Sequence, residues 1–157
     1  MNIFNNLSQK LSKKSLSFED YLQKAQERCV ELNLESITIS DCDHNYSMKD
    51  AQEELGLDDD LIDSLIEDFV VQIISNISLF KKYLNQSKET QDLTIFRELA
   101  HKNLGVARNL RIKDMQKILK EMMGKDDPEE ILKYIDYLEA CAIILKPETA
   151  YEAYKKR

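Results

Sequence analysis

Residues 58–87 read DDDLIDSLIEDFVVQIISNISLFKKYLNQS and carry the pattern that decides the fold. Large apolar side chains recur there every three or four residues, a spacing that places them on one face of a helix. These side chains are Ile62, Ile66, Phe69, Ile73, Ile77, Phe80 and Leu84. Acids stand at the start, and Lys81 and Lys82 near the end, an order that suits the helix dipole. The stretch therefore predicts a long amphipathic helix whose apolar face needs partners.

Similar patterns occur on both sides of this stretch and are separated by short polar turns. Ser17 is suited to begin a helix and Gly56 to end one, while Gly124 and Pro128 mark a stop and a restart. The segment SKETQD, residues 87–92, predicts a turn. Further helices are expected over residues 17–34, 47–56, 93–110, 113–123, 127–146 and 147–157.

Because every expected element is helical, the expected fold class is all-α. The four helices between Asp58 and Lys146 are joined by turns too short for crossover connections, which predicts an antiparallel up-and-down four-helix bundle. Residues 47–157 would form this bundle, and residues 1–46 an N-terminal helical extension packed on it. A chain of 157 residues has room for one hydrophobic core of full size.

Composition restricts the classes of function. A net charge of −7 argues against nucleic-acid binding, since a phosphate backbone needs a basic surface. The first residues lack the apolar run of a signal peptide, and no segment is apolar enough to span a bilayer, so no membrane partner is expected. Three cysteines without a C-x-x-C spacing fit neither a disulfide framework nor a zinc site, and we expect a cytoplasmic protein.

His101 stands in the helical stretch IFRELAHKNLGVARNL, residues 95–110. Steps of 100° per residue place it on the polar half of the helix, with Arg97, Gly105 and Arg108. A glycine inside a helix costs about 1 kcal/mol relative to alanine, and on a solvent-exposed face no packing requirement explains Gly105. An exposed imidazole beside a cleared space and two cations suits phosphoryl transfer, because imidazole is nucleophilic and cations stabilise phosphoryl oxygens.

The segment around this histidine is also basic. Residues 97–125 hold eight lysines and arginines against Glu98, Asp114 and Glu121. Such a run is commonly a solvated helix face. The alternative is a locally electropositive region on an acidic protein.

The segment AHKNLGVARNL resembles the motif of the histidine phosphotransfer (HPt) domains of bacterial and plant phosphorelays. That motif is a histidine, any residue, leucine, lysine and glycine, followed by small residues and an apolar pair. The matching positions are Ala100, His101, Gly105, Ala107 and the pair Asn109–Leu110, without gaps. The resemblance covers roughly residues 47–146, and outside the motif it consists mainly of helix length and pattern.

The resemblance implies a phosphoryl carrier of a two-component system, not an independent catalyst. His101 would accept a phosphoryl group from the aspartate of a response-regulator receiver domain or from a hybrid histidine kinase, and pass it on to another receiver. The expected site residues are His101, Arg97 and Arg108 for the chemistry, and Lys102, Leu104 and Gly105 for partner binding. No metal or cofactor is expected on this chain, since Mg²⁺ would belong to the receiver, and the protein is expected to be a monomer.

Three positions depart from the family motif. Asn103 stands where the family has leucine, within the apolar arc, so we expect it to be buried and hydrogen bonded. Leu104 replaces the lysine one turn after the histidine, and Arg108 is expected to supply the missing cation. Arg111 occupies a position that is often glycine.

Two other functions fit the same sequence. One is a degenerate HPt-like bundle that binds proteins without carrying phosphate. The other is an adaptor that acts through its N-terminal extension, where a small apolar stripe is formed by Ile3, Phe4, Leu7 and Leu11. The loop at residues 41–45, DCDHN, contains metal-ligand residue types, but the glycine and bidentate glutamate of an EF-hand are missing, so no metal site is expected.

Overall fold

The computed structural model describes residues 16–31 and 48–157, and all regular secondary structure in these two ranges is helical. The helices are α2 (Phe18–Glu31), α3 (Met48–Leu55), α4 (Asp59–Thr90), α5 (Thr94–Asn109), α6 (Lys113–Met123), α7 (Pro128–Leu145) and α8 (Pro147–Lys155). The expected all-α class is confirmed. The expected N-terminal apolar stripe and the 41–45 loop lie outside the described residues.

Helix α4 has terminal groups that are satisfied by local contacts at both ends. Asp58 precedes it, and the Asp58 Oδ1 atom accepts a hydrogen bond from the backbone N–H of Leu61 at 2.9 Å. Gln91 follows the helix with a left-handed backbone, φ 57°, and its N–H donates to the Ser87 carbonyl at 2.7 Å. These contacts explain where the long helix begins and ends.

The predicted turn at residues 87–92 begins too early, because α4 continues to Thr90. Ser87 is buried, and its hydroxyl donates to the carbonyl of Leu84. The Thr90 hydroxyl donates to the carbonyl of Gln86 at 3.2 Å. These polar side chains therefore bond to the helix backbone, and α4 continues past the expected stop.

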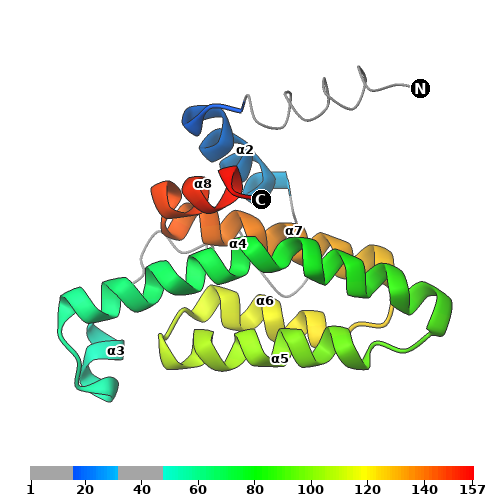
Figure 1. Ribbon diagram of the computed structural model, residues 1–157. Helices are drawn as coiled ribbons and strands as arrows, with labels where there is room; N and C mark the ends of the chain where they lie inside the picture. Colours follow the sequence, from blue (N-terminus) through cyan, green and yellow to red (C-terminus); the bar gives the residue numbers. More distant parts are fainter. Residues whose placement is uncertain (1–15, 32–47) are drawn as a thin grey trace.

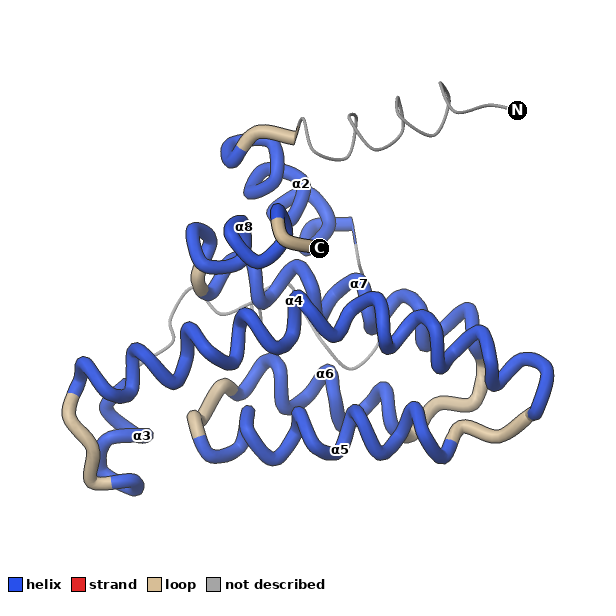
Figure 2. The backbone as a smooth tube through the Cα atoms, viewed as in Figure 1, coloured by secondary structure: helices blue, strands red, loops and turns tan. Residues whose placement is uncertain are grey.

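Helices α4, α5, α6 and α7 pack in a closed ring, in which α4 and α6 each contact both α5 and α7. Figures 1 and 2 show α4 and α7 in a middle layer, with α5 and α6 on one side and α2 and α8 on the other. The seven apolar side chains of the predicted α4 stripe are all buried. Phe80 meets Phe96 of α5 edge to face, with the ring centroids 5.6 Å apart. Burial of each large apolar side chain contributes about 1.5–3 kcal/mol.

Helix α2 packs on α7 and α8, away from α5 and α6 (Figure 1). The ring of Tyr21 stacks on Tyr154 at a centroid distance of 4.5 Å, and burial raises the pKa of the Tyr21 hydroxyl. Arg28 donates to the Glu139 carboxylate at 3.2 Å. Residues 16–31 therefore share the core of the other helices. No helix within the described ranges is both long enough and apolar enough to cross a membrane.

Candidate functional site

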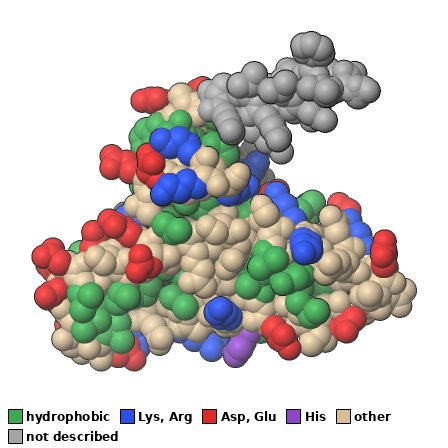
Figure 3. Space-filling view, in the orientation of Figure 1, with side chains coloured by type: hydrophobic (Ala, Val, Ile, Leu, Met, Phe, Trp, Pro, Cys, Tyr) green, Lys and Arg blue, Asp and Glu red, His purple; other side chains and the backbone are tan. Residues whose placement is uncertain are grey.

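His101 lies near the middle of α5 and is exposed to solvent, as predicted. Its imidazole makes no hydrogen bond and no ion pair with the described part of the chain, residues 16–31 and 48–157. Figure 3 shows the histidine at the lower edge of the molecule, with lysine and arginine side chains next to it. A reactant can therefore reach the ring without displacing a protein contact.

Gly105, one turn after His101, is a glycine that the fold does not require. It is exposed, and a Cβ atom built on it would meet no atom within 4 Å. Its φ lies outside the left-handed region in which glycine is favoured. Neither packing nor backbone conformation explains a residue that costs about 1 kcal/mol relative to alanine. The absence of a side chain at position 105 leaves an open space beside His101.

Asn103 is fully buried, and both ends of its side-chain amide are hydrogen bonded. The Nδ2 atom donates to the Leu99 carbonyl at 2.8 Å, and the Oδ1 atom accepts from Gln72 Nε2 of α4 at 3.1 Å. The expectation of a buried, bonded Asn103 is confirmed. Gln72 was not predicted, because within the α4 pattern it is one of several polar residues. Its contact turns this edge of α5 toward α4.

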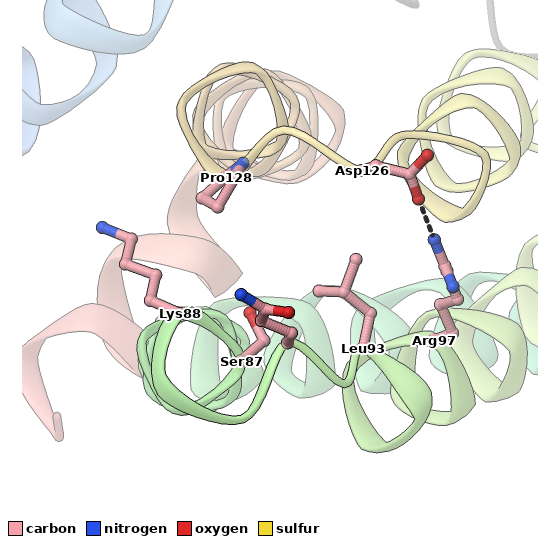
Figure 4. A pocket seen from close by; sticks show the side chains of 7 residues that line it. Ser87, Lys88, Leu93, Arg97, Asp126 and Pro128 are labelled. Atoms are coloured by element: carbon pink, nitrogen blue, oxygen red, sulfur yellow. Dashed lines mark hydrogen bonds and ion pairs between the residues drawn. The ribbon is translucent and has the colours of Figure 1, made fainter.

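Arg97 holds the opposite edge of α5 against the turn between α6 and α7. Its Nε donates to the Met123 carbonyl at 3.1 Å, and its Nη2 donates to the Lys125 carbonyl at 3.3 Å and to Asp126 at 2.8 Å. Figure 4 shows Arg97 and Asp126 facing each other at the wall of a cavity of about 350 Å³. With these acceptors engaged, Arg97 is a structural link and not the free cation that was expected.

Arg108 is an exposed cation of α5 on the same side of the helix as His101. It lies two turns after the histidine and within about 20° of the same line along the helix. The guanidinium is exposed and forms no ion pair with the described residues. Because side chains of a helix lean toward its N-terminus, a side chain at this position is directed toward the turn that carries Gly105.

The edge of α5 that faces α4 is apolar at the surface. Ile95 is 56% exposed, and Leu99 and Val106 are half-buried. Lys102 is exposed between this edge and His101. Leu104 was expected to contact a partner. It is 3% exposed and belongs to the core, because the rotation of α5 that exposes His101 turns this position inward.

The turn after α5 contains a strained residue. Arg111 has a φ of 60°, a left-handed conformation that costs a non-glycine residue about 1–2 kcal/mol. Its guanidinium forms an ion pair with Glu54 of α3. Glycine adopts this backbone conformation without strain, so the departure from glycine noted in the sequence has a conformational cost here.

Within residues 16–31 and 48–157, no three His, Cys, Asp or Glu side chains are grouped so that they could hold a metal ion.

Comparisons of the chain with protein-family models, with curated proteins and with solved structures gave no match. The candidate site is therefore defined by its geometry: an exposed His101, an open Gly105, and an Arg108 that forms no ion pair with residues 16–31 and 48–157.

Proposed function

We propose that this protein is a phosphoryl carrier of a two-component phosphorelay, with His101 as the phosphoryl acceptor. The observation that carries the proposal is an exposed imidazole, without a hydrogen bond to the described part of the chain, next to a glycine one turn away that the packing does not need. The donor would be the aspartyl phosphate of a receiver domain or a hybrid histidine kinase. A further receiver would take the group from His101.

The transfer is a displacement at phosphorus. The unprotonated imidazole nitrogen of His101 attacks the phosphoryl group, the N–P bond forms, and the P–O bond to the donor aspartate breaks. The aspartate leaves as a carboxylate, while the other imidazole nitrogen keeps its proton. Arg108 would stabilise the charge on the phosphoryl oxygens. Mg²⁺ would be held by the receiver, and the return transfer follows the same steps in reverse.

The arrangement of the helices supports this function. We infer that α4, α5, α6 and α7, which pack in a ring, form an antiparallel up-and-down bundle of the HPt type. In this bundle the apolar edge of α5, formed by Ile95, Leu99 and Val106, would contact the receiver together with Lys102. The protein would act as a cytoplasmic monomer.

Phosphoryl transfer from labelled receiver domains tests the proposal. The protein is incubated with a panel of phosphorylated receivers from the same organism, and the label on the protein is measured. We expect a label that is stable in alkali and lost in acid, as a phosphoramidate is. The His101→Gln variant should take none, and its far-ultraviolet circular dichroism should match that of the wild type because residue 101 is exposed.

A second function, protein binding without phosphate, is favoured by one observation. Position 104 holds a buried leucine where the family carries a lysine, so α5 lacks that cation one turn after the histidine. If a receiver binds the protein tightly but no phosphorylated partner labels it, the protein is an interaction module and not a phosphoryl carrier.

A further inference from the structure

Helix α6 presents a row of lysines to solvent. Lys113, Lys117 and Lys120 are exposed and recur at intervals of four and three residues, so they lie on one face of the helix. The opposite face is buried in the core and includes Ile118 and Met122. The lysine row therefore lies on the solvent-exposed side of α6, away from its buried face.

This row lies beside the edge of α5 that carries His101. Gln116 of α6 donates to the Ala107 carbonyl at 3.4 Å, and Arg97 of α5 reaches the Met123 carbonyl at the end of α6. These two contacts place α6 along the Arg97 edge of α5, which also carries His101. We define the basic face as the surface formed by Arg108, Lys113, Lys117 and Lys120.

The fold leaves much of this positive charge without a partner. Arg108, Lys113 and Lys120 form no ion pair within the described ranges. Other cations of the same segment are paired, since Arg97 contacts Asp126 and Arg111 contacts Glu54. Of the three acids in residues 97–125, Asp114 is buried. The basic face is therefore a positively charged surface on a chain whose net charge is −7.

We propose that the basic face docks an acidic protein surface on the domain that exchanges the phosphoryl group with His101. The inference rests on the proposed function for the identity of this partner. Figure 3 shows aspartate and glutamate side chains at both ends of the molecule. They would repel an extended polyanion such as a nucleic acid more than a compact acidic protein surface that docks on the basic face.

Complementary charge acts mainly on the rate of association. A matched pair of charged surfaces raises the association rate constant by about 10- to 1000-fold at low ionic strength, and salt removes the gain. Docking on α6 would also bring the donor aspartate to the Arg97 edge of α5, next to the imidazole. The basic face would thus orient the partner without taking part in the chemical step.

Charge reversal tests this docking. The test variant changes Lys113, Lys117 and Lys120 to Glu together, and the control variant changes Lys82, Lys133 and Lys156 to Glu. Both variants alter the net charge equally, and all six lysines are exposed. Stopped-flow association with the receiver panel is measured at 50 and 300 mM salt. The test variant should associate at least about tenfold more slowly at 50 mM, with a smaller difference at 300 mM, and the control should stay close to the wild type.

The outcomes separate this inference from the proposed function. If His101 is labelled normally and the test variant associates as fast as the wild type, the basic-face inference is overturned and the carrier function is not. Slower association with a receiver that never labels His101 supports the basic face and overturns the carrier function. Equal slowing in both variants, or binding of a DNA duplex in place of any receiver, also overturns the inference. If the test variant loses helical content, its three single variants replace it, each expected to slow association by about two- to threefold.

Discussion

The side-chain amide of Gln72 on α4 donates a hydrogen bond to Asn103 on α5, with 3.1 Å between the Nε2 and Oδ1 atoms. Asn103 is fully buried, so this bond replaces the water that its amide oxygen loses on folding. The contact turns one edge of α5 toward α4. His101, two residues earlier, is thereby left on the solvent side of the helix.

The Gln72→Leu variant should be less stable than the wild type. It leaves the buried Asn103 oxygen without its α4 donor, which costs about 1–3 kcal/mol in free energy of unfolding. The double variant Gln72→Leu/Asn103→Leu should recover most of the loss, since no buried polar group remains unpaired. Urea unfolding measures both changes, with Ser75→Ala on the exposed side of α4 as control. Equal stabilities for the single and double variants would contradict the role of this bond.

The Gly105→Ala variant should be more stable than the wild type by about 0.5–1 kcal/mol. The added Cβ meets no atom within 4 Å, and alanine has less backbone freedom to lose on folding than glycine. The same change at Gly56, where φ is 67°, should instead destabilise the protein. Thermal unfolding compares the two. A destabilised Gly105→Ala would mean that the fold requires this glycine, and the clearance beside His101 would lose its support.

A larger side chain at the same position separates function from folding. Gly105→Leu should fold normally, because the space is open, but should weaken receiver binding. A Gly105→Leu variant that binds and accepts label like the wild type would show that the partner does not use this space.

Asp92 in the turn before α5 should make stability depend on acid pH. Hydrogen bonds from the hydroxyl and the backbone N–H of Thr94 lower the pKa of the Asp92 carboxyl below its usual value of about 3.9. The ionised form is thus favoured in the folded state, so its contribution is present above that usual pKa and is lost as the pH falls through the lower folded value. The stability difference between wild type and Asp92→Ala should shrink from pH 6 toward pH 2. A difference that is constant over this range would contradict the pKa shift.

The elements that follow from local periodicity could be predicted from the sequence. The buried stripe of α4 and the exposure of His101 both depend on the 3.6-residue repeat. The end of α4 could not be predicted in this way, because polar residues such as Ser87 and Thr90 either break a helix or bond back to it.

Contacts between segments that lie far apart in the sequence could not be predicted either. Arg97 and Arg108 lie close to the same line along α5 and were expected to act alike. The turn between α6 and α7 engages Arg97, whereas the surface near Arg108 offers it no acceptor in the described chain. Leu104 lies close to the boundary between the two halves of α5, and the contact of Asn103 with Gln72 sets the rotation that buries it.

The Arg108→Ala variant should slow phosphoryl transfer to His101 by roughly tenfold, because one charge that stabilises the phosphoryl oxygens is lost. Helical content should not change, since an exposed arginine contributes little to folding. Lys133→Ala removes another exposed cation, on α7, and serves as control. Transfer rates that are the same for both variants would remove Arg108 from the mechanism.

The most direct test of the account is the position of the label after incubation with phosphorylated receiver domains. Proteolysis and mass spectrometry locate the phosphoryl group under alkaline conditions that preserve phosphohistidine. If His101 is the acceptor, the peptide that contains His101 carries an acid-labile phosphoryl group, and the His101→Gln variant carries none. A label on any other residue, or label retained by His101→Gln, would contradict it.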